Sequence, residues 1–133
     1  MKFMVILKGE RYCEPRSATR SFEMARYNRA LVKAGVLIAA EELHPSARGA
    51  RVERTNGKTA VAQGPFGEAG GVIAGLWILN VPSLRDAVEW VKRCPLVERA
   101  DAKFTIRQIY DFGDFGATES QEIDERREPL VAA

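Results

Sequence analysis

Apolar runs recur along the chain at intervals that predict four strands. Residues 2–8 have a continuous apolar centre, and residues 72–81 form the most apolar run of the sequence. A run without polar alternation is typical of a strand that is covered on both faces. Two further runs, 36–43 and 103–111, complete the set of predicted strands.

Two amphipathic stretches predict helices. In the first, 18–34, the apolar side carries one plainly polar residue, Asn28, which must find a hydrogen-bond partner if it is buried. Gly35 follows at the position of a C-terminal cap. The second helix begins after Ser83, with Asp86 three residues on as its capping-box partner.

Between the strands, the pair Asn56-Gly57 separates residues 51–55 from residues 58–63. Asn-Gly between two short Val- and Thr-containing runs is the strongest short-range signal of a hairpin. The order along the chain is therefore βαβ, a small hairpin and βαβ. This order predicts an α+β fold, a ferredoxin-like sandwich of two helices on a four-stranded sheet.

The length of 133 residues fits one domain, which we expect to span residues 1–116. Residues 117–133 are predicted to form a polar acidic tail, because seven charged residues lie between Glu119 and Glu128. Burying those charges would be costly, so we expect the tail to add little to the core.

Two helices cover only one face of a four-stranded sheet, yet the run 72–81 is apolar on both faces. Leu76 and Ile78 alternate with Trp77 and Leu79, so each face of this strand carries large apolar side chains. Monomers rarely expose an apolar patch of this size. The pattern therefore predicts a homodimer that covers the second sheet face.

Composition excludes several classes of function. The chain has 20 Lys and Arg against 18 Asp and Glu, and this net charge of +2 gives no field that argues for direct nucleic-acid binding. No apolar stretch approaches the roughly 20 residues of a membrane span, and the N-terminus lacks the features of a signal peptide. Two cysteines, Cys13 and Cys94, cannot build a disulfide framework, so we expect a reducing, cytoplasmic location.

Cofactor and metal sites have no support in the sequence. The glycines at 64–71 fit neither the dinucleotide-binding nor the phosphate-loop pattern, and a single histidine without a spaced partner is not a metal site. We therefore expect neither a cofactor nor a metal.

His44 is the one histidine and the natural candidate for acid–base chemistry near neutral pH. If residues 36–44 stay extended, Ile38, Ala40, Glu42 and His44 share one face, so Glu42 and His44 could act on one small molecule. The alternative is that His44 only makes a local hydrogen bond at the strand end. Arg107 is a candidate for binding an anion, or for an ion pair with an acid such as Glu68 or Asp111.

Four short motifs, taken in order, resemble the YCII-related proteins of the DGPF type. They are Leu43-His44-Pro45-Ser46, Gln63-Gly64-Pro65-Phe66-Gly67-Glu68, Ala87-Val88-Glu89-Trp90-Val91-Lys92-Arg93-Cys94-Pro95 and Ile106-Arg107-Gln108. The resemblance implies a dimeric α+β barrel, in which two ferredoxin-like units pair sheet to sheet. It also implies a link to sigma factors of the extracytoplasmic-function type, near which relatives are often encoded.

The sequence departs from this family pattern at the second motif. Gln63 stands where relatives have an Asp, and Ala69-Gly70-Gly71 replaces their Thr-Lys-Glu run, so three charges are missing. The backbone roles survive better, because Gly64 and Pro65 can still form the turn and Phe66 can still pack.

Two functions are consistent with these residues. The first is a small-molecule-binding or regulatory module; the alternative is a small enzyme that uses His44 as general acid or base on an anionic small molecule anchored by Arg107. Dimeric α+β barrels include enzymes with a pocket between sheet and helices, which is an analogy at the level of the fold. The scarcity of chemical groups favours the first function. In either case we expect a pocket at the end of strand 36–43, with His44 in its wall and Phe66 nearby.

Overall fold

The structure is a computed structural model that describes residues 1–9, 12, 18–67, 71–98 and 102–114. The predicted tail, 117–133, and Cys13 lie outside the described residues.

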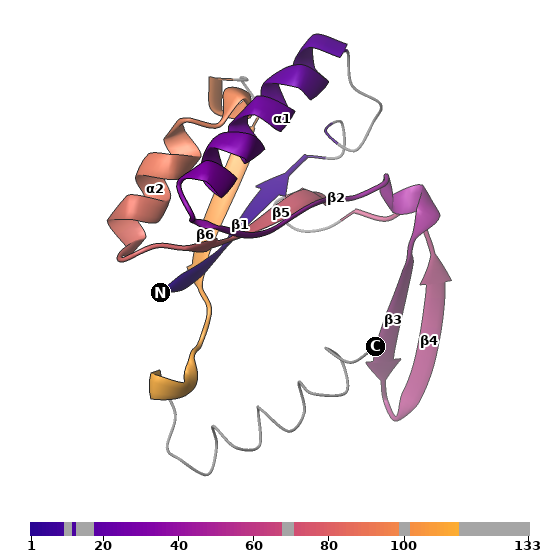
Figure 1. The fold of residues 1–133 in the computed structure, drawn as a ribbon. Coiled ribbons are helices and arrows are strands. Elements are labelled where there is room, and N and C mark those ends of the chain that lie inside the picture. Colours follow the sequence, from indigo (N-terminus) through magenta and orange to yellow (C-terminus); the bar gives the residue numbers. More distant parts are fainter. Residues whose placement is uncertain (10–11, 13–17, 68–70, 99–101, 115–133) are drawn as a thin grey trace.

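Two helices cover one face of a four-stranded antiparallel sheet (Figure 1). The helices are α1 (Ala18–Lys33) and α2 (Leu84–Lys92). The strands are β1 (Lys2–Lys8), β2 (Leu37–Glu42), β5 (Ile73–Asn80) and β6 (Lys103–Gln108), in the order β2-β5-β1-β6. This arrangement confirms the predicted α+β class, and the strand order is that of a ferredoxin-like sandwich.

The core lies between the sheet and the two helices. Along β1 every second side chain is buried, with Phe3 only 1% exposed, because a strand turns alternate residues to opposite faces. Leu31 of α1 and Ala87 of α2 are fully buried against this face. Asn28 is satisfied as expected: Trp77 Nε1 donates to Asn28 Oδ1 over 2.9 Å.

The end of α1 and the start of α2 each carry the predicted cap. At the end of α1, Gly35 has φ +74°, its N–H donates to the carbonyl of Val32 over 2.9 Å, and the N–H of Val36 donates to that of Leu31 over 3.1 Å. These two bonds form a Schellman motif. At the start of α2, Ser83 Oγ accepts from the Asp86 N–H over 3.2 Å, and this confirms the predicted N-cap.

The sheet face away from the helices, which we term the open face, carries a central apolar quartet. Its cross-strand pairs are Met4 with Ile78 and Ile6 with Leu76. The flanking strands place Arg107 beside Met4 and Glu41 beside Leu76, so one cation and one anion lie at diagonally opposite corners of the quartet.

A separate hairpin consists of β3 (Ala50–Thr55) and β4 (Lys58–Gln63). Its turn has positive φ at both Asn56 (53°) and Gly57 (77°), as a type I′ turn requires, and this confirms the hairpin prediction. The hairpin projects from the sheet on the side away from the helices (Figure 1).

Candidate functional site

A groove lies at the end of β2, where the sequence predicts a pocket. It has a volume of about 320 Å³. We term it the β2 groove; six of the residues that line it are Leu43, His44, Arg48, Phe66, Val72 and Ile73. Apolar side chains therefore meet two basic side chains in one concave surface.

Two motifs meet beside the groove through backbone contacts. The short helix η2 (Ser46–Arg48) follows His44, and the segment 64–66 bonds to it and to the residue after it; of that segment Phe66 lines the groove, whereas Gly64 and Pro65 do not. The Gly64 N–H donates to the carbonyl of Gly49 over 2.9 Å, and the Phe66 N–H donates to the buried Ser46 Oγ over 3.2 Å. A Cβ atom at Gly64 would overlap the Ser46 carbonyl, so only glycine fits here.

His44 is exposed, and its ring lies next to Arg48. Arg48 Nη1 is 3.5 Å from Nδ1 and 3.4 Å from Nε2 of that ring. Sequence reasoning missed Arg48; the signal was its nearness to His44, four residues on in the segment that follows β2. A second arginine, Arg51, stacks over the Phe66 ring at 4.6 Å and donates from Nη2 to the Gly67 carbonyl over 2.8 Å.

Glu42 does not join His44 in this groove. It lines a different hollow of about 260 Å³ on the helix side of the sheet, next to Asn28 and Trp77. The expected parity of the strand is also wrong at one position, because a register shift between Leu37 and Ala39 leaves Ile38 51% exposed. Glu42 and His44 thus line different hollows, and their joint action on one molecule stays a prediction.

Arg107 lies far from the β2 groove in the same chain. It is on β6, and β6 and β2 are the two edge strands of the sheet. Three interstrand spacings of about 4.8 Å separate them, which is roughly 14 Å across the sheet. Among the described residues, no ion pair joins Arg107 to Asp111, and Glu68 lies outside them. The role of Arg107 as an anion ligand stays a prediction.

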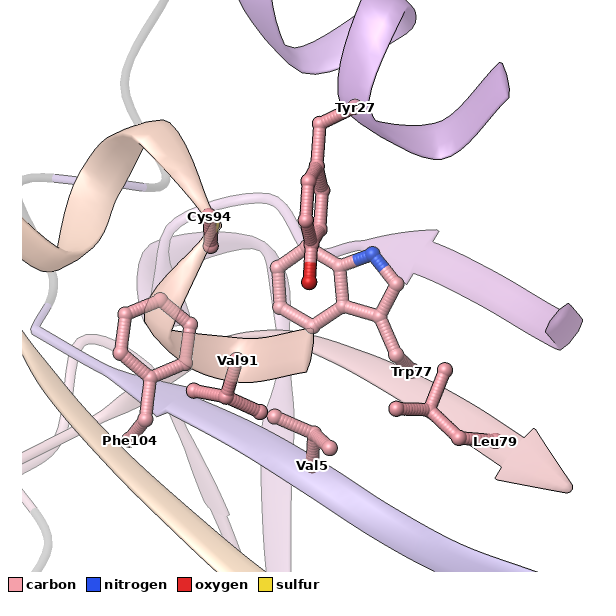
Figure 2. A pocket seen from close by; sticks show the side chains of 7 residues that line it. All are labelled: Val5, Tyr27, Trp77, Leu79, Val91, Cys94 and Phe104. Carbon is pink, nitrogen blue, oxygen red and sulfur yellow. The ribbon is translucent and has the colours of Figure 1, made fainter. Parts of the chain in front are cut away.

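A small internal cavity lies between the sheet and the two helices. Figure 2 shows seven side chains around this cavity, with Tyr27 reaching from α1 toward the indole of Trp77. The cavity has a volume of about 10 Å³, room for roughly one water molecule. The Tyr27 hydroxyl donates to the Trp90 carbonyl over 2.7 Å. Burial raises the pKa of this phenol well above its ordinary value; Cys94 adds to the increase and Arg93 opposes it.

The family model of the YCII-related domain matches residues 1–113, from the start of β1 to within the last short helix, η4 (Phe112–Asp114). The chain belongs to the YCII-related domain family. No curated protein matches it.

A wide groove of about 1010 Å³ runs between α1 and α2 of this YCII-related domain. Its lining includes Arg26, Trp90 and Arg93, whose guanidinium carbon lies 4.6 Å from the Trp90 ring centre. Arg29 and Lys33 of α1 are exposed, as Arg26 is, so this helix carries a basic outer face. Five residues of the third family motif line this groove, namely Trp90, Lys92, Arg93, Cys94 and Pro95, whereas the first two motifs shape the β2 groove.

Within the part of the YCII-related domain that the structure describes, no three His, Cys, Asp or Glu side chains are grouped to hold a metal ion. In the same residues, neither helix has the length and apolar character that crossing a membrane requires.

Proposed function

We propose that this YCII-related domain binds a small anionic molecule with an apolar body in the β2 groove. The observation that carries the proposal is that the groove joins the guanidinium of Arg48 to an apolar wall containing Phe66 and Ile73. A guanidinium binds a carboxylate or phosphate through two parallel hydrogen bonds, and the apolar wall provides contact area for the rest of the ligand.

Sodium benzoate is a suitable probe, because it combines a carboxylate with an aromatic ring. In amide NMR spectra of the full chain, we expect saturable shifts confined to residues 43–49, 64–67 and 72–73. Arg48→Gln should weaken benzoate binding by at least about tenfold, since a charge-assisted hydrogen bond contributes roughly 1.5–3 kcal/mol. His44→Ala should also weaken binding, while changing the free energy of unfolding by less than about 1 kcal/mol.

Arg54→Gln is the matched control, because Arg54 is an exposed arginine on the hairpin and does not line the β2 groove. Equal benzoate affinity in Arg48→Gln and the parent chain would contradict the proposed site. So would shifts spread over the open face instead of the groove.

Catalysis is the second candidate, and one observation favours it: His44 lines the groove and is exposed to a bound molecule. No carboxylate of the described residues lines that groove beside it, and Gln63 stands where relatives have an Asp. A general base usually needs a group that orients it or accepts its proton. Binding is therefore the stronger proposal. Electron density in the groove of a crystal grown without added ligand would identify the natural molecule.

We also propose that the domain is a homodimer through its open face. The apolar quartet supports this, since Met4, Ile6, Leu76 and Ile78 are only half-buried in one copy. Charge supports it as well. Glu41 lies on β2, level with Leu76 and Ile6, and Arg107 lies on β6, level with Met4 and Ile78. The centre of the apolar quartet is therefore midway between Glu41 and Arg107. A two-fold axis running obliquely to the strands through that centre brings Glu41 of each copy opposite Arg107 of the other.

Charge reversal tests this pairing. Glu41→Arg and Arg107→Glu should each weaken the dimer in sedimentation equilibrium, because each variant creates two like-charge contacts per dimer. The double variant should recover most of the affinity, since both contacts become attractive again. Failure of the double variant to recover would overturn the pairing, and a monomeric parent chain at micromolar concentration would overturn the dimer.

The regulatory part of the proposal rests on the resemblance alone, which implies a link to a sigma factor. A ligand-binding dimer suits such a role, because ligand can shift the equilibrium between two states of an assembly. We also propose that the protein is cytoplasmic, where a sigma factor acts.

A further inference from the structure

The apolar wall of the β2 groove is supported by an arginine that does not itself line the groove. Phe66 is the largest apolar side chain among the described residues of the groove's lining, and it is half-buried. The guanidinium carbon of Arg51, on β3, lies 4.6 Å from the centre of the Phe66 ring. A cation at this distance is attracted to the face of an aromatic ring, so Arg51 covers one face of Phe66.

Arg51 also fixes the backbone next to that ring. Its Nη2 donates to the carbonyl of Gly67, directly after Phe66, over 2.8 Å. Hydrogen bonds to residues 46–49 fix the start and the middle of the segment 64–66. The chain around Phe66 is therefore tied on both sides of this residue, and Arg51 provides both the last of these bonds and the contact with the ring.

The hairpin of β3 and β4 determines where the Arg51 guanidinium lies. Arg51 is paired across the hairpin with Ala62, whose short side chain leaves room for the arginine. Glu53, two residues on and so on the same face of β3, has its Oε1 3.9 Å from Arg51 Nε. A planar guanidinium that stacks on a ring and donates to a carbonyl has a defined orientation. The strand pairing of the hairpin is thereby connected to the wall of the β2 groove.

We propose that Arg51 is a positioning residue that sets the ligand preference of the β2 groove through Phe66. This inference rests on the proposed binding of an apolar anion in that groove. Arg48 provides the charge that any carboxylate uses, whereas the fixed ring of Phe66 provides apolar area that only a ligand with a large body uses. Arg51 thereby favours anions with an extended planar body, such as a fused aromatic carboxylate, over small carboxylates.

Two aromatic acids separate these two contributions. Sodium 2-naphthoate has one ring more than sodium benzoate, and the parent chain should bind it about tenfold more tightly, because the second ring buries more apolar surface. Arg51→Ala should reduce this ratio to below about threefold, since the unsupported Phe66 ring no longer offers a fixed surface. Arg48→Gln should weaken both acids by a similar factor and keep the ratio. Arg54→Gln, on the same strand of the hairpin, is the control and should keep both affinities.

A double-mutant cycle tests whether Arg51 acts through Phe66. Phe66→Leu should lower the ratio by itself, and Arg51→Ala should then have little further effect, because the side chain on which it acts is gone. Additive effects of the two substitutions would overturn the proposal. A measurement on the parent chain does not depend on how the variants fold: saturation with naphthoate should shift the NMR signals of the Phe66 ring protons, and unchanged signals would also overturn the proposal.

The outcomes separate this inference from the proposed function. If neither acid binds the parent chain, the proposed function fails and this inference fails with it. If both acids bind and their ratio is the same in Arg51→Ala as in the parent chain, only the role of Arg51 is wrong. A ratio that falls equally in Arg54→Gln would assign the effect to the charge of the hairpin instead of to the contact with Phe66, and would overturn the inference as well.

Discussion

At Gly64 the chain passes so close to the carbonyl group of Ser46 that a Cβ atom would overlap it. We expect Gly64→Ala to reduce the free energy of unfolding by roughly 1–3 kcal/mol or more, because the backbone of η2 must shift to make room. Gly67→Ala is the matched control, since a Cβ there meets nothing within 4 Å. Urea denaturation of the two variants measures the difference. Equal losses would mean that the contact between the two motifs does not stabilise the domain.

Tyr27 gives the domain a pH dependence in the alkaline range. The pKa of Tyr27 is raised in the folded state, mainly by burial, so folding favours the protonated phenol. This contribution is fully present below the unfolded pKa of about 10 and is lost as the pH rises through the higher folded value. The parent chain should therefore lose stability above pH 10 more steeply than Tyr27→Phe does.

Tyr27→Phe should also be less stable at neutral pH, by about 1–3 kcal/mol, because the Trp90 carbonyl loses its hydrogen bond. Urea denaturation between pH 7 and about pH 11 measures both effects. Parallel pH profiles for the parent and the variant would contradict the assignment to Tyr27.

At the scale of elements, local chemistry sets where the helices begin and end. Ser83 caps α2 through the Asp86 N–H, and its hydroxyl donates to Asp86 Oδ2 over 2.7 Å. Ser83→Ala should cost about 1 kcal/mol in the free energy of unfolding, because an N–H at the first turn loses its acceptor. Ser83→Thr keeps both the acceptor and the donor to Asp86 and should be close to the parent chain. Thermal denaturation of both variants checks this, and the same loss in each would exclude the cap as the cause.

The register shift in β2 shows what a sequence pattern misses at this scale. Alternation along residues 37–42 predicts that Ile38 shares a face with Ala40, but the shift turns Leu37 and Ala40 toward the core instead. Such an irregularity depends on the pairing with β5, which the residues of β2 do not encode by themselves.

At the scale of the molecule, neighbouring residues of β5 differ in what they stabilise. Leu79 is 1% exposed in the core, whereas Leu76 is half-buried on the open face. Leu79→Glu should unfold the domain, because it buries an unpaired charge. Leu76→Glu should instead give a folded monomer. Circular dichroism and light scattering distinguish the two results. A Leu76→Glu chain that stays dimeric would place the interface elsewhere.

The sequence by itself determined the secondary elements, their order and the α+β class. Each of these depends on local spacing: the alternation of β1, the Asn56-Gly57 turn, the cap at Gly35. It also predicted a pocket at the end of β2, where the structure has a groove, because His44 and the segment 64–67 belong to motifs that can be recognised in the sequence. Only the tertiary structure decided which candidate residues meet.

The tertiary structure brings Ser46 and Phe66, which are 20 positions apart in the chain, into contact and adds Arg48 to the β2 groove. It places Glu42 and Arg107 outside that groove. The physical reason is that strand pairing and backbone packing join residues distant in sequence. A shift of one residue in that pairing changes the face on which a side chain lies.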